Sequence, residues 1–378
     1  MLNSKSALGI IFPNSYDETV PELVNLRLMA SIPFASRYRL IDFMLSSMAN
    51  ADIDNISFLV NKNYLSLMDH LGSGREWDLV RKNGGLHMFP PNAEKTTKAY
   101  TGRVSAIASI LEFLKVQKEK YVVMADSNIA VNFDFKAMID AHVESGADVT
   151  IAYTEEKIPE GYKQLPDDQG FYYSLGLEDN RVKEIFVNMK NDEVQNLSMN
   201  VFVVEREKLI ELIYVAFVRG QRYFERDVLL NQLDVLNVQG YKCDKYAARI
   251  TSIKGYFDEN MKLLDDANLD GLFGGAPIYT KIRDDNPTRY ITGAKVENVM
   301  AADGCVIEGE VENSILFRGV KVAKGAKVKN CILMQDTVIE AGADIEYLIT
   351  DKNVVISADK EMKGTDSYPI YINKGQTV

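Results

Sequence analysis

A six-residue repeat in the C-terminal part of the chain constrains the fold more than any other feature of the sequence. From about Ile291 an apolar residue recurs at every sixth position, with two slips of one residue, at Val299, Cys305, Val311, Phe317, Val322, Val328, Met334, Ile339 and Ile345. One apolar residue per hexapeptide is typical of a β-helix, whose interior these side chains fill, and the small pairs Gly325-Ala326 and Gly342-Ala343 suit its tight corners. The alternative is an antiparallel β-domain with coincidental spacing. Because β-helices stack on one another, this region is also an expected assembly surface.

The preceding residues alternate short apolar runs with helical spacing, which predicts an α/β domain with a largely parallel sheet. We expect strands over residues 6–12, 56–60, 121–125, 149–153 and 199–204, and helices over 39–51, 103–116, 135–145, 208–217, 227–238 and 256–267. Ligands of such sheets lie at the carboxyl ends of the strands, so chemistry is expected just after Phe12 and Ala125. Residues 268–290 are rich in Gly, Asp and Pro and predict a linker. The expected division is therefore a domain over 1–267, a linker over 268–290 and a β-helix over 291–378.

The net charge of -11 argues against a protein that binds nucleic acid, because such proteins carry excess positive charge. A phosphate ligand would need a local basic pocket. The three cysteines form no C-x-x-C pair, which favours reduced thiols in a cytoplasmic protein. The N-terminal apolar run is too short for a signal peptide, and no segment approaches the ~20 apolar residues of a membrane span.

Two segments of the α/β part carry a family resemblance. The sequence SIPFASRYRLIDFMLSSMANADI over residues 31–53 resembles a segment of the ADP-glucose pyrophosphorylases (glucose-1-phosphate adenylyltransferases), and so does YVVMADSNIAVNFDF over 121–135. The order of the parts also matches over nearly the whole chain. The resemblance implies a Rossmann-like (GT-A-like) nucleotidyltransferase domain with a mixed, mostly parallel sheet, followed by a left-handed β-helix. It also implies Mg²⁺-dependent joining of ATP and glucose 1-phosphate, with release of pyrophosphate, in glycogen biosynthesis.

The segment after the first strand departs from the family pattern. There the family has a glycine-rich loop whose backbone wraps the triphosphate. This chain has PNSYDETVPEL, which contains two prolines and three carboxylates but no glycine. Prolines remove N–H donors and carboxylates repel phosphate, so we expect nucleotide binding to be impaired. The alternative is a diverged loop that still works.

Three further family positions lack the expected residue. Met29 stands where the family has a lysine that contacts phosphate, although the nearby Arg27 could keep a residual phosphate contact. Arg103 replaces a small residue that lines the nucleotide. Asn188 aligns with the lysine that binds the sugar phosphate.

The metal site tests the resemblance most sharply. The family uses two aspartates; the first aligns with Asp126 and the second with Arg249. A cation at a ligand position works against Mg²⁺, and Arg249 could instead pair with Asp126. Either reading makes Asp126 a vestigial ligand, so no cofactor is expected for this subunit.

Arg37 and Arg39 are the candidate effector-binding residues. In the family the position of Arg37 is a lysine that binds sugar-phosphate effectors between the two domains, and arginine suits phosphate at least as well. The alternative is a surface arginine without a ligand. Asp42, in the same motif, is expected to be a buried structural carboxylate.

These departures resemble the GlgD-type subunits of the family, and they predict a non-catalytic regulatory and assembly partner of a catalytic subunit, most simply in a heterotetramer. Three alternatives remain. The chain could be an active nucleotidyltransferase with a rearranged site, for which Lys62, Lys95 and Lys98 are candidate phosphate donors. It could be a hexapeptide acyltransferase, although no histidine follows His142. It could also be a sugar-phosphate sensor that never assembles with a partner.

Overall fold

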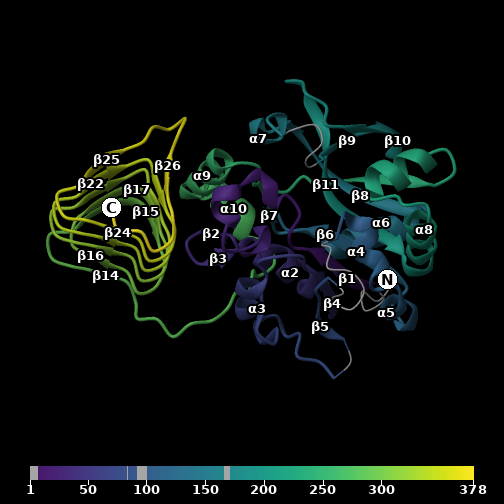
Figure 1. The fold of residues 1–378 in the computed structure, drawn as a ribbon, viewed down its shortest axis with the longest axis horizontal. Coiled ribbons are helices and arrows are strands. Elements are labelled where there is room, and N and C mark those ends of the chain that lie inside the picture. Colours follow the sequence, from purple (N-terminus) through teal and green to yellow (C-terminus); the bar gives the residue numbers. More distant parts are fainter. Residues whose placement is uncertain (1–6, 83, 92–99, 166–170) are drawn as a thin grey trace.

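The computed structural model describes residues 7–82, 84–91, 100–165 and 171–378. Figure 1 shows an α/β domain joined to a stack of β-coils by an extended segment. The candidate donors Lys95 and Lys98 lie outside the described residues. Within the described ranges, no helix is long and apolar enough to cross a membrane.

A nine-stranded sheet forms the centre of the α/β domain, in the order β5-β4-β1-β6-β11-β8-β12-β10-β9. Its strands are β1 (Ala7–Phe12), β4 (Asn55–Leu59), β5 (Gly85–Phe89), β6 (Tyr121–Asp126), β8 (Val149–Lys157), β9 (Tyr173–Glu178), β10 (Arg181–Val187), β11 (Val194–Glu205) and β12 (Val238–Lys242). The α/β fold is thereby confirmed, and the sheet is mixed as predicted. Its parallel part is limited to the β5-β4-β1-β6 half and the β8–β12 pair, because β11, β10 and β9 run antiparallel to their neighbours.

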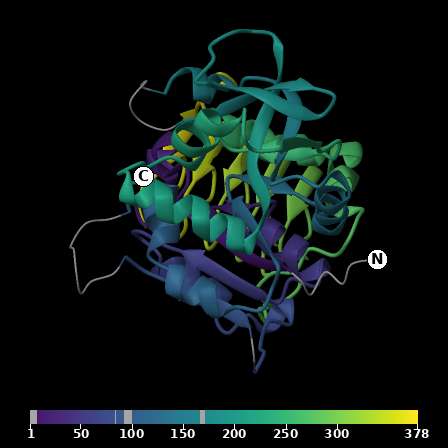
Figure 2. The ribbon, with the colours of Figure 1, turned by 90° about the vertical axis from the view of Figure 1, so that its right-hand side faces the viewer.

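Strand β1 is buried on both faces, which explains its uninterrupted apolar sequence. Successive side chains point to opposite faces of a strand, so Ala7 and Ile11 join one core while Leu8, Ile10 and Phe12 join the other. The first core is covered by α2 (Leu40–Asn50) and α6 (Phe135–Ser145), and the second by α4 (Arg103–Ala108), α5 (Leu111–Val116) and α8 (Arg206–Val218). Figure 2 looks onto this domain with the β-helix behind it.

Several predicted helices end elsewhere. The helix expected over 103–116 is divided into α4 and α5 around Ser109 and Ile110. The helix expected over 227–238 is wrong: a π-helical segment (Phe224–Leu229) and a 3-10 turn (Leu230–Gln232) come first, and β12 begins at Val238. The helix expected over 256–267 begins earlier, as α9 (Ile253–Met261).

A further helix, α10 (Asp266–Phe273), occupies the start of the predicted linker, because the Asp265 side chain accepts hydrogen bonds from the N–H groups of Ala267 and Asn268 and caps a new helix. The extended connection therefore begins after Phe273.

The β-helix repeat is confirmed. Its coils stack in parallel on three faces. The first face contains β14 (Arg289–Tyr290), β16 (Val306–Ile307), β18 (Lys321–Val322), β21 (Val338–Ile339) and β24 (Val355–Ile356), and the second contains β15 (Lys295–Ala301), β17 (Glu310–Leu316), β19 (Lys327–Lys329), β22 (Asp344–Glu346) and β25 (Glu361–Lys363). On the third face β17 is followed by β20 (Ile332–Leu333), β23 (Leu348–Thr350) and β26 (Ile370–Ile372). All nine repeat positions are buried except Val299, which is partly buried. The two slips of register fall at corners where Gly319 and Asp336 have φ of 70° and 58°. Gly325 and Gly342, the predicted corner glycines, also have positive φ, a conformation that glycine adopts without cost.

The two domains share an apolar cluster. Phe34, Tyr256 and Phe257 of the α/β domain belong to the same buried set as Phe317 and Met334 of the β-helix. Helix α9 lies at this junction, beside β26 (Ile370–Ile372) in Figure 1. The shared core fixes the position of the β-helix against the end of the α/β domain.

Candidate functional site

One pocket of the α/β domain lies where the sequence predicts a ligand site. Phe12 and Asp126 end the parallel neighbours β1 and β6 and stand opposite each other in the register. Both line a cavity of about 310 Å³, together with Ser15, Arg103 and Glu225. We call this cavity the strand-end pocket. Its volume is at the lower end of the range for small-molecule sites.

Asp126 is almost fully buried and has a complete set of partners. Its Oδ1 accepts from the Ser15 hydroxyl at 2.7 Å, and its Oδ2 accepts from Asn200 Nδ2 at 3.0 Å. Arg103 Nη2 contacts both oxygens, at 3.2 and 3.1 Å. A cation of the chain itself therefore stands against the carboxylate.

Arg103 is held by two carboxylates and two aromatic rings. Its Nη2 also pairs with Glu225 Oε1 at 3.0 Å, and its guanidinium carbon lies 4.4 Å from the ring centre of Phe12 and 5.3 Å from that of Phe202. Burial acts to lower the pKa of Arg103, but Asp126 and Glu225 outweigh it and raise that pKa above its usual value. Burial raises the pKa of Glu225 in turn, against the lowering effect of Arg103. The guanidinium is thus a permanent counterion inside the pocket.

The pairing expected of Arg249 is corrected by the structure. Arg249, at the end of β13 (Ala247–Arg249), pairs with Glu156 at 2.9 Å, and its guanidinium also donates to the Ser198 carbonyl and the Thr154 hydroxyl. The residue that pairs with Asp126 is Arg103 instead. Among the described residues, no group of three or more Asp, Glu, His or Cys side chains is arranged to hold a metal ion.

The segment after β1 is folded. It forms a 3-10 turn (Asp17–Thr19) and the short helix α1 (Pro21–Val24). Met29 is fully buried, and its N–H donates to Asp17 Oδ1 at 2.7 Å. Burial raises the pKa of Asp17 to about 6, although Asn14 and the Met29 N–H act to lower it. The Asp17 carboxylate is thus held by polar groups of the same segment, and Met29 is a core residue.

Asn188 and Arg27 have structural roles. The Oδ1 of Asn188, whose φ is 51°, accepts from the Tyr172 N–H at 3.1 Å, and this bond joins the residue after β10 to the residue before β9. Arg27 forms a buried bidentate pair with Asp351 of the β-helix, at 2.6 and 2.7 Å. The residual phosphate contact expected of Arg27 does not fit this position, because its guanidinium points to the other domain. Met29, Asn188, Arg249 and Arg27 all lie outside the lining of the strand-end pocket.

Arg37 and Arg39 line a second pocket, between the α/β domain and the β-helix. We call it the domain-boundary pocket. It gathers six cationic side chains from both domains: Arg37, Arg39, Lys281, Arg283, Arg318 and Lys352. Four of the six were missed in the sequence. Only the local K-x-R pattern of Lys281 and Arg283 could have suggested any of them, since Arg318 and Lys352 reach the site through the folding of the β-helix.

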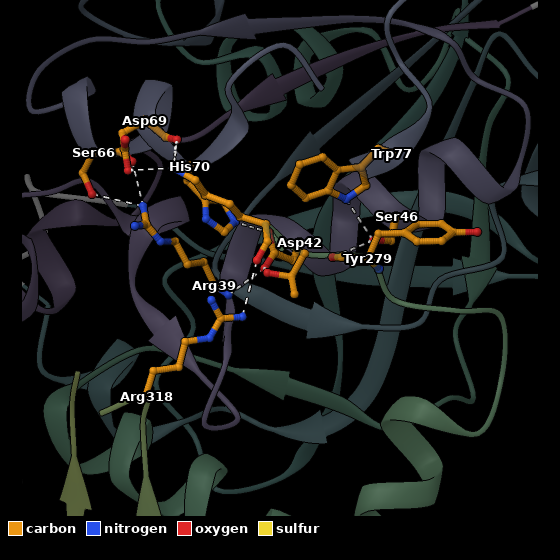
Figure 3. Close-up of polar contacts among 11 residues, drawn as sticks. Arg39, Asp42, Ser46, Ser66, Asp69, His70, Trp77, Tyr279 and Arg318 are labelled. Carbon is orange, nitrogen blue, oxygen red and sulfur yellow. Dashed lines mark hydrogen bonds and ion pairs between the residues drawn. The ribbon is translucent and has the colours of Figure 1, made fainter. Parts of the chain in front are cut away.

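A buried network supports this pocket (Figure 3). Asp42, fully buried as predicted, accepts from the Arg39 N–H at 2.9 Å and from the Thr280 hydroxyl at 2.6 Å, and it contacts His70 Nε2 at 2.5 Å. Arg39 Nη1 donates to the Ser66 carbonyl at 2.7 Å. Arg39 is thereby positioned by backbone and hydroxyl groups.

The fold and the two pockets define a nucleotidyltransferase-type chain that carries a hexapeptide β-helix. In agreement, residues 27–164 match the "Nucleotidyl transferase" family, and residues 282–368 match "GlmU-like, C-terminal hexapeptide".

Individual relatives match a larger share of the chain than these two family models do. The chain is 36% identical over 370 residues to "Glycogen biosynthesis protein GlgD" of Bacillus subtilis (strain 168), over 97% of this chain and 96% of that protein. It is 37% identical to the protein of the same name from Geobacillus stearothermophilus, over 99% and 97%. It is 32% identical to "Glucose-1-phosphate adenylyltransferase" of Bacillus mycoides (strain KBAB4), over 79% of each chain. The chain belongs to the glucose-1-phosphate adenylyltransferase family and, within it, to the GlgD type.

Proposed function

We propose that this chain is a cytoplasmic regulatory and assembly partner of a catalytic glucose-1-phosphate adenylyltransferase subunit, most simply in a heterotetramer. The observation that carries the proposal is the Arg103–Asp126 pair, because it fills the strand-end pocket with an internal cation. Two relatives bear the name of a glycogen biosynthesis protein, which is the pathway that the proposal requires. Another relative bears the name of the adenylyltransferase, which is the kind of partner that the proposal requires.

The residues of the strand-end pocket do not fit the Mg²⁺ that the family implies. Magnesium requires oxygen ligands at ~2.0–2.1 Å in near-octahedral geometry. Both oxygens of Asp126 contact Arg103 Nη2, and Glu225 pairs with the same nitrogen. A metal ion here would have to displace a buried arginine and would leave its positive charge unpaired. We therefore derive no catalytic step through a metal.

The charge of the pocket also disfavours phosphate. Among the described residues, its lining includes the carboxylates of Glu18, Asp126 and Glu225 and one cation, Arg103. A triphosphate would face net negative charge in a partly buried site, where electrostatic repulsion is stronger than in water. Binding of two polyanionic substrates at this place is accordingly disfavoured.

The domain-boundary pocket is the proposed effector site of this chain. Six cations from both domains suit an anionic ligand such as a sugar phosphate, and among them Arg37 stands at the effector-binding position that the family resemblance implies, with Arg39 as the second candidate. A ligand that contacts both domains can bias their relative arrangement if the arrangement differs between active and inactive assemblies. In this proposal the effector acts on the partner subunit through that arrangement.

The test is a titration of this chain into a fixed amount of the catalytic subunit from the same cell, with pyrophosphate release measured across a range of sugar-phosphate concentrations. The proposal predicts altered activity or effector response that saturates at a fixed ratio of the chains. A chain with Arg103→Met, Asp126→Asn and Glu225→Gln, in which the strand-end pocket has lost its charges, should give the same response. A mixture whose activity and effector response equal those of the catalytic subunit alone would reject the proposal.

A further inference from the structure

Helix α8 exposes an apolar surface at the end of the molecule opposite the β-helix (Figure 1). Its inner residues are buried in the second core: Leu209, Leu212, Ile213 and Ala216. Four large apolar side chains of its outer side are between 38% and 69% exposed: Tyr214, Val215, Phe217 and Val218. We call these four residues the α8 face. Single exposed apolar residues are ordinary on a soluble protein, but a contiguous apolar patch marks an interaction site.

The charged residues on the two sides of the α8 face have opposite signs. Glu207 and Glu211 are exposed on its N-terminal side, and Arg219 and Arg222 are exposed on its C-terminal side. Because residues three and four apart share one side of a helix, Glu207 and Glu211 lie on the same outward stripe as Tyr214. Along the helix, the outer surface therefore changes from acidic to apolar to basic.

These charges are weakly compensated within the chain. Lys208 lies 3.6 Å from Glu211, and Arg206 lies 3.8 Å from Glu207, which are loose contacts. The side chains of Arg219 and Arg222 form no ion pair within the described part of the chain. The basic end of the helix is thus free to pair with carboxylates of another molecule.

The order of charges is complementary to itself when the direction is reversed. Glu211 and Arg219 are each four residues from Val215. In two antiparallel copies of α8, related by a twofold axis at the level of Val215, Glu211 of each copy lies opposite Arg219 of the other. The two α8 faces then meet between these pairs, and the twofold axis repeats every contact. A parallel pair of helices would instead place like charges opposite one another.

We propose that α8 binds α8 of a second copy of this chain, in an antiparallel contact that buries the two α8 faces between two Glu211–Arg219 pairs. The apolar side chains supply the affinity, and the charge pairs fix the direction of the helices. This contact goes beyond the proposed function, because it joins two copies of this chain and does not involve the catalytic subunit.

The first experiment is sedimentation velocity of the full chain, without the catalytic subunit, over a range of micromolar concentrations. Tyr214→Ser should weaken self-association by about tenfold or more, because each dimer loses two tyrosines from the centre of the contact. Tyr368→Ser, which removes an exposed tyrosine of the β-helix, should associate as the parent chain does. Both tyrosines are largely exposed, so both variants should keep the melting temperature of the parent chain.

Charge reversal tests the antiparallel register. In Glu211→Arg alone, and in Arg219→Glu alone, like charges face each other at both ends of the contact, so each variant should associate with itself about tenfold more weakly than the parent chain. In an equimolar mixture of the two variants, opposite charges face each other at both ends. The mixture should therefore form dimers with about the affinity of the parent chain.

Four results would overturn the proposal. The first is a parent chain that stays monomeric over the whole concentration range. The second is self-association that Tyr214→Ser leaves unchanged, since another surface such as the β-helix would then carry it. The third is a mixture of the charge variants that associates as weakly as each variant alone. The fourth is a Tyr214→Ser chain that loses affinity for the catalytic subunit and keeps its self-association, which would assign the α8 face to that subunit. The first three results leave the regulatory role to its own titration.

Discussion

Replacement of Arg103 by methionine tests whether its guanidinium is the counterion of the strand-end pocket. Methionine keeps an apolar stem against Phe12 and Phe202 but leaves Asp126 and Glu225 without a cation. Removal of one partner of a buried ion pair costs about 3–5 kcal/mol, because a buried charge stays uncompensated. Loss of the cation–π contacts adds about 1 kcal/mol. We expect Arg103→Met to lower the free energy of unfolding by about 4–6 kcal/mol near neutral pH.

Urea denaturation at two pH values measures this cost. In the variant the two carboxyls can regain neutrality by protonation, so the deficit should shrink as the pH is lowered from about 7.5 to 5.5. The control is the triple variant Arg103→Met, Asp126→Asn, Glu225→Gln, which removes all three charges and should lie within about 2 kcal/mol of the parent chain. A cost below about 1 kcal/mol for Arg103→Met, or a triple variant as unstable as the single one, would refute the reasoning.

Four other predictions follow from the same structure. Arg27→Met should destabilise the chain by about 3–5 kcal/mol in urea denaturation, and Asp351→Asn in the same chain should recover most of the loss; an unchanged midpoint would contradict the role of this pair. Burial lowers the pKa of His142 to about 4, so the stability that neutral His142 contributes is present above its unfolded pKa of about 6.5 and is lost as the pH falls. Between about pH 7 and 5 the free energy of unfolding of the parent chain should therefore fall by about 2 kcal/mol more than that of His142→Asn. Equal changes of stability with pH in the two chains would exclude this assignment. Millimolar Mg²⁺ should leave the melting temperature of the parent chain unchanged because Arg103 holds Asp126, and a saturable rise would show that the metal displaces it. Arg37→Ala should raise the effector concentration for half-maximal response in the assembled enzyme about tenfold, and an unaltered response curve would remove Arg37 from the site.

Features set by local periodicity could be predicted from the sequence. The hexapeptide positions from Val299 to Ile345 follow directly from the need to fill the interior of each coil. The placement of Asp126 opposite Phe12 follows from the rule that parallel strands bring their carboxyl ends to one edge. The edge hairpin β9–β10 was not predicted, because its charged and half-exposed residues give no clear alternation.

Pairings across long sequence separations could not be predicted. Comparison of motifs marked Arg103 as unusual, but its partner Glu225 lies in an irregular π-helical segment without a recognisable motif. Arg249 was placed beside Asp126 because the alignment put it at a metal-ligand position, yet its guanidinium is taken up by Glu156 on the neighbouring β8. Arg27 was assigned to phosphate for the same reason. Its partner, Asp351, becomes close only when the β-helix docks.

The domain-boundary pocket contains residues that the sequence identifies and residues that it does not. Arg37 and Arg39 belong to a recognisable motif, and their assignment as effector ligands stays a prediction. Lys352 and Arg318 lie in the repeat region, where periodicity identifies the buried positions and gives no information about which coil faces the other domain. Only the folded arrangement brings these four cations together.

The most direct test of the central claim is pyrophosphate release from ATP and glucose 1-phosphate by the purified chain alone, with Mg²⁺ present and the catalytic subunit as a positive control. We predict no release above the uncatalysed background, because the place of the metal is taken by Arg103 and the segment after β1 has no glycine-rich backbone to bind phosphate. Turnover comparable to that of the catalytic subunit, abolished by Asp126→Asn, would contradict the account and would show that the rearranged pocket is an active site.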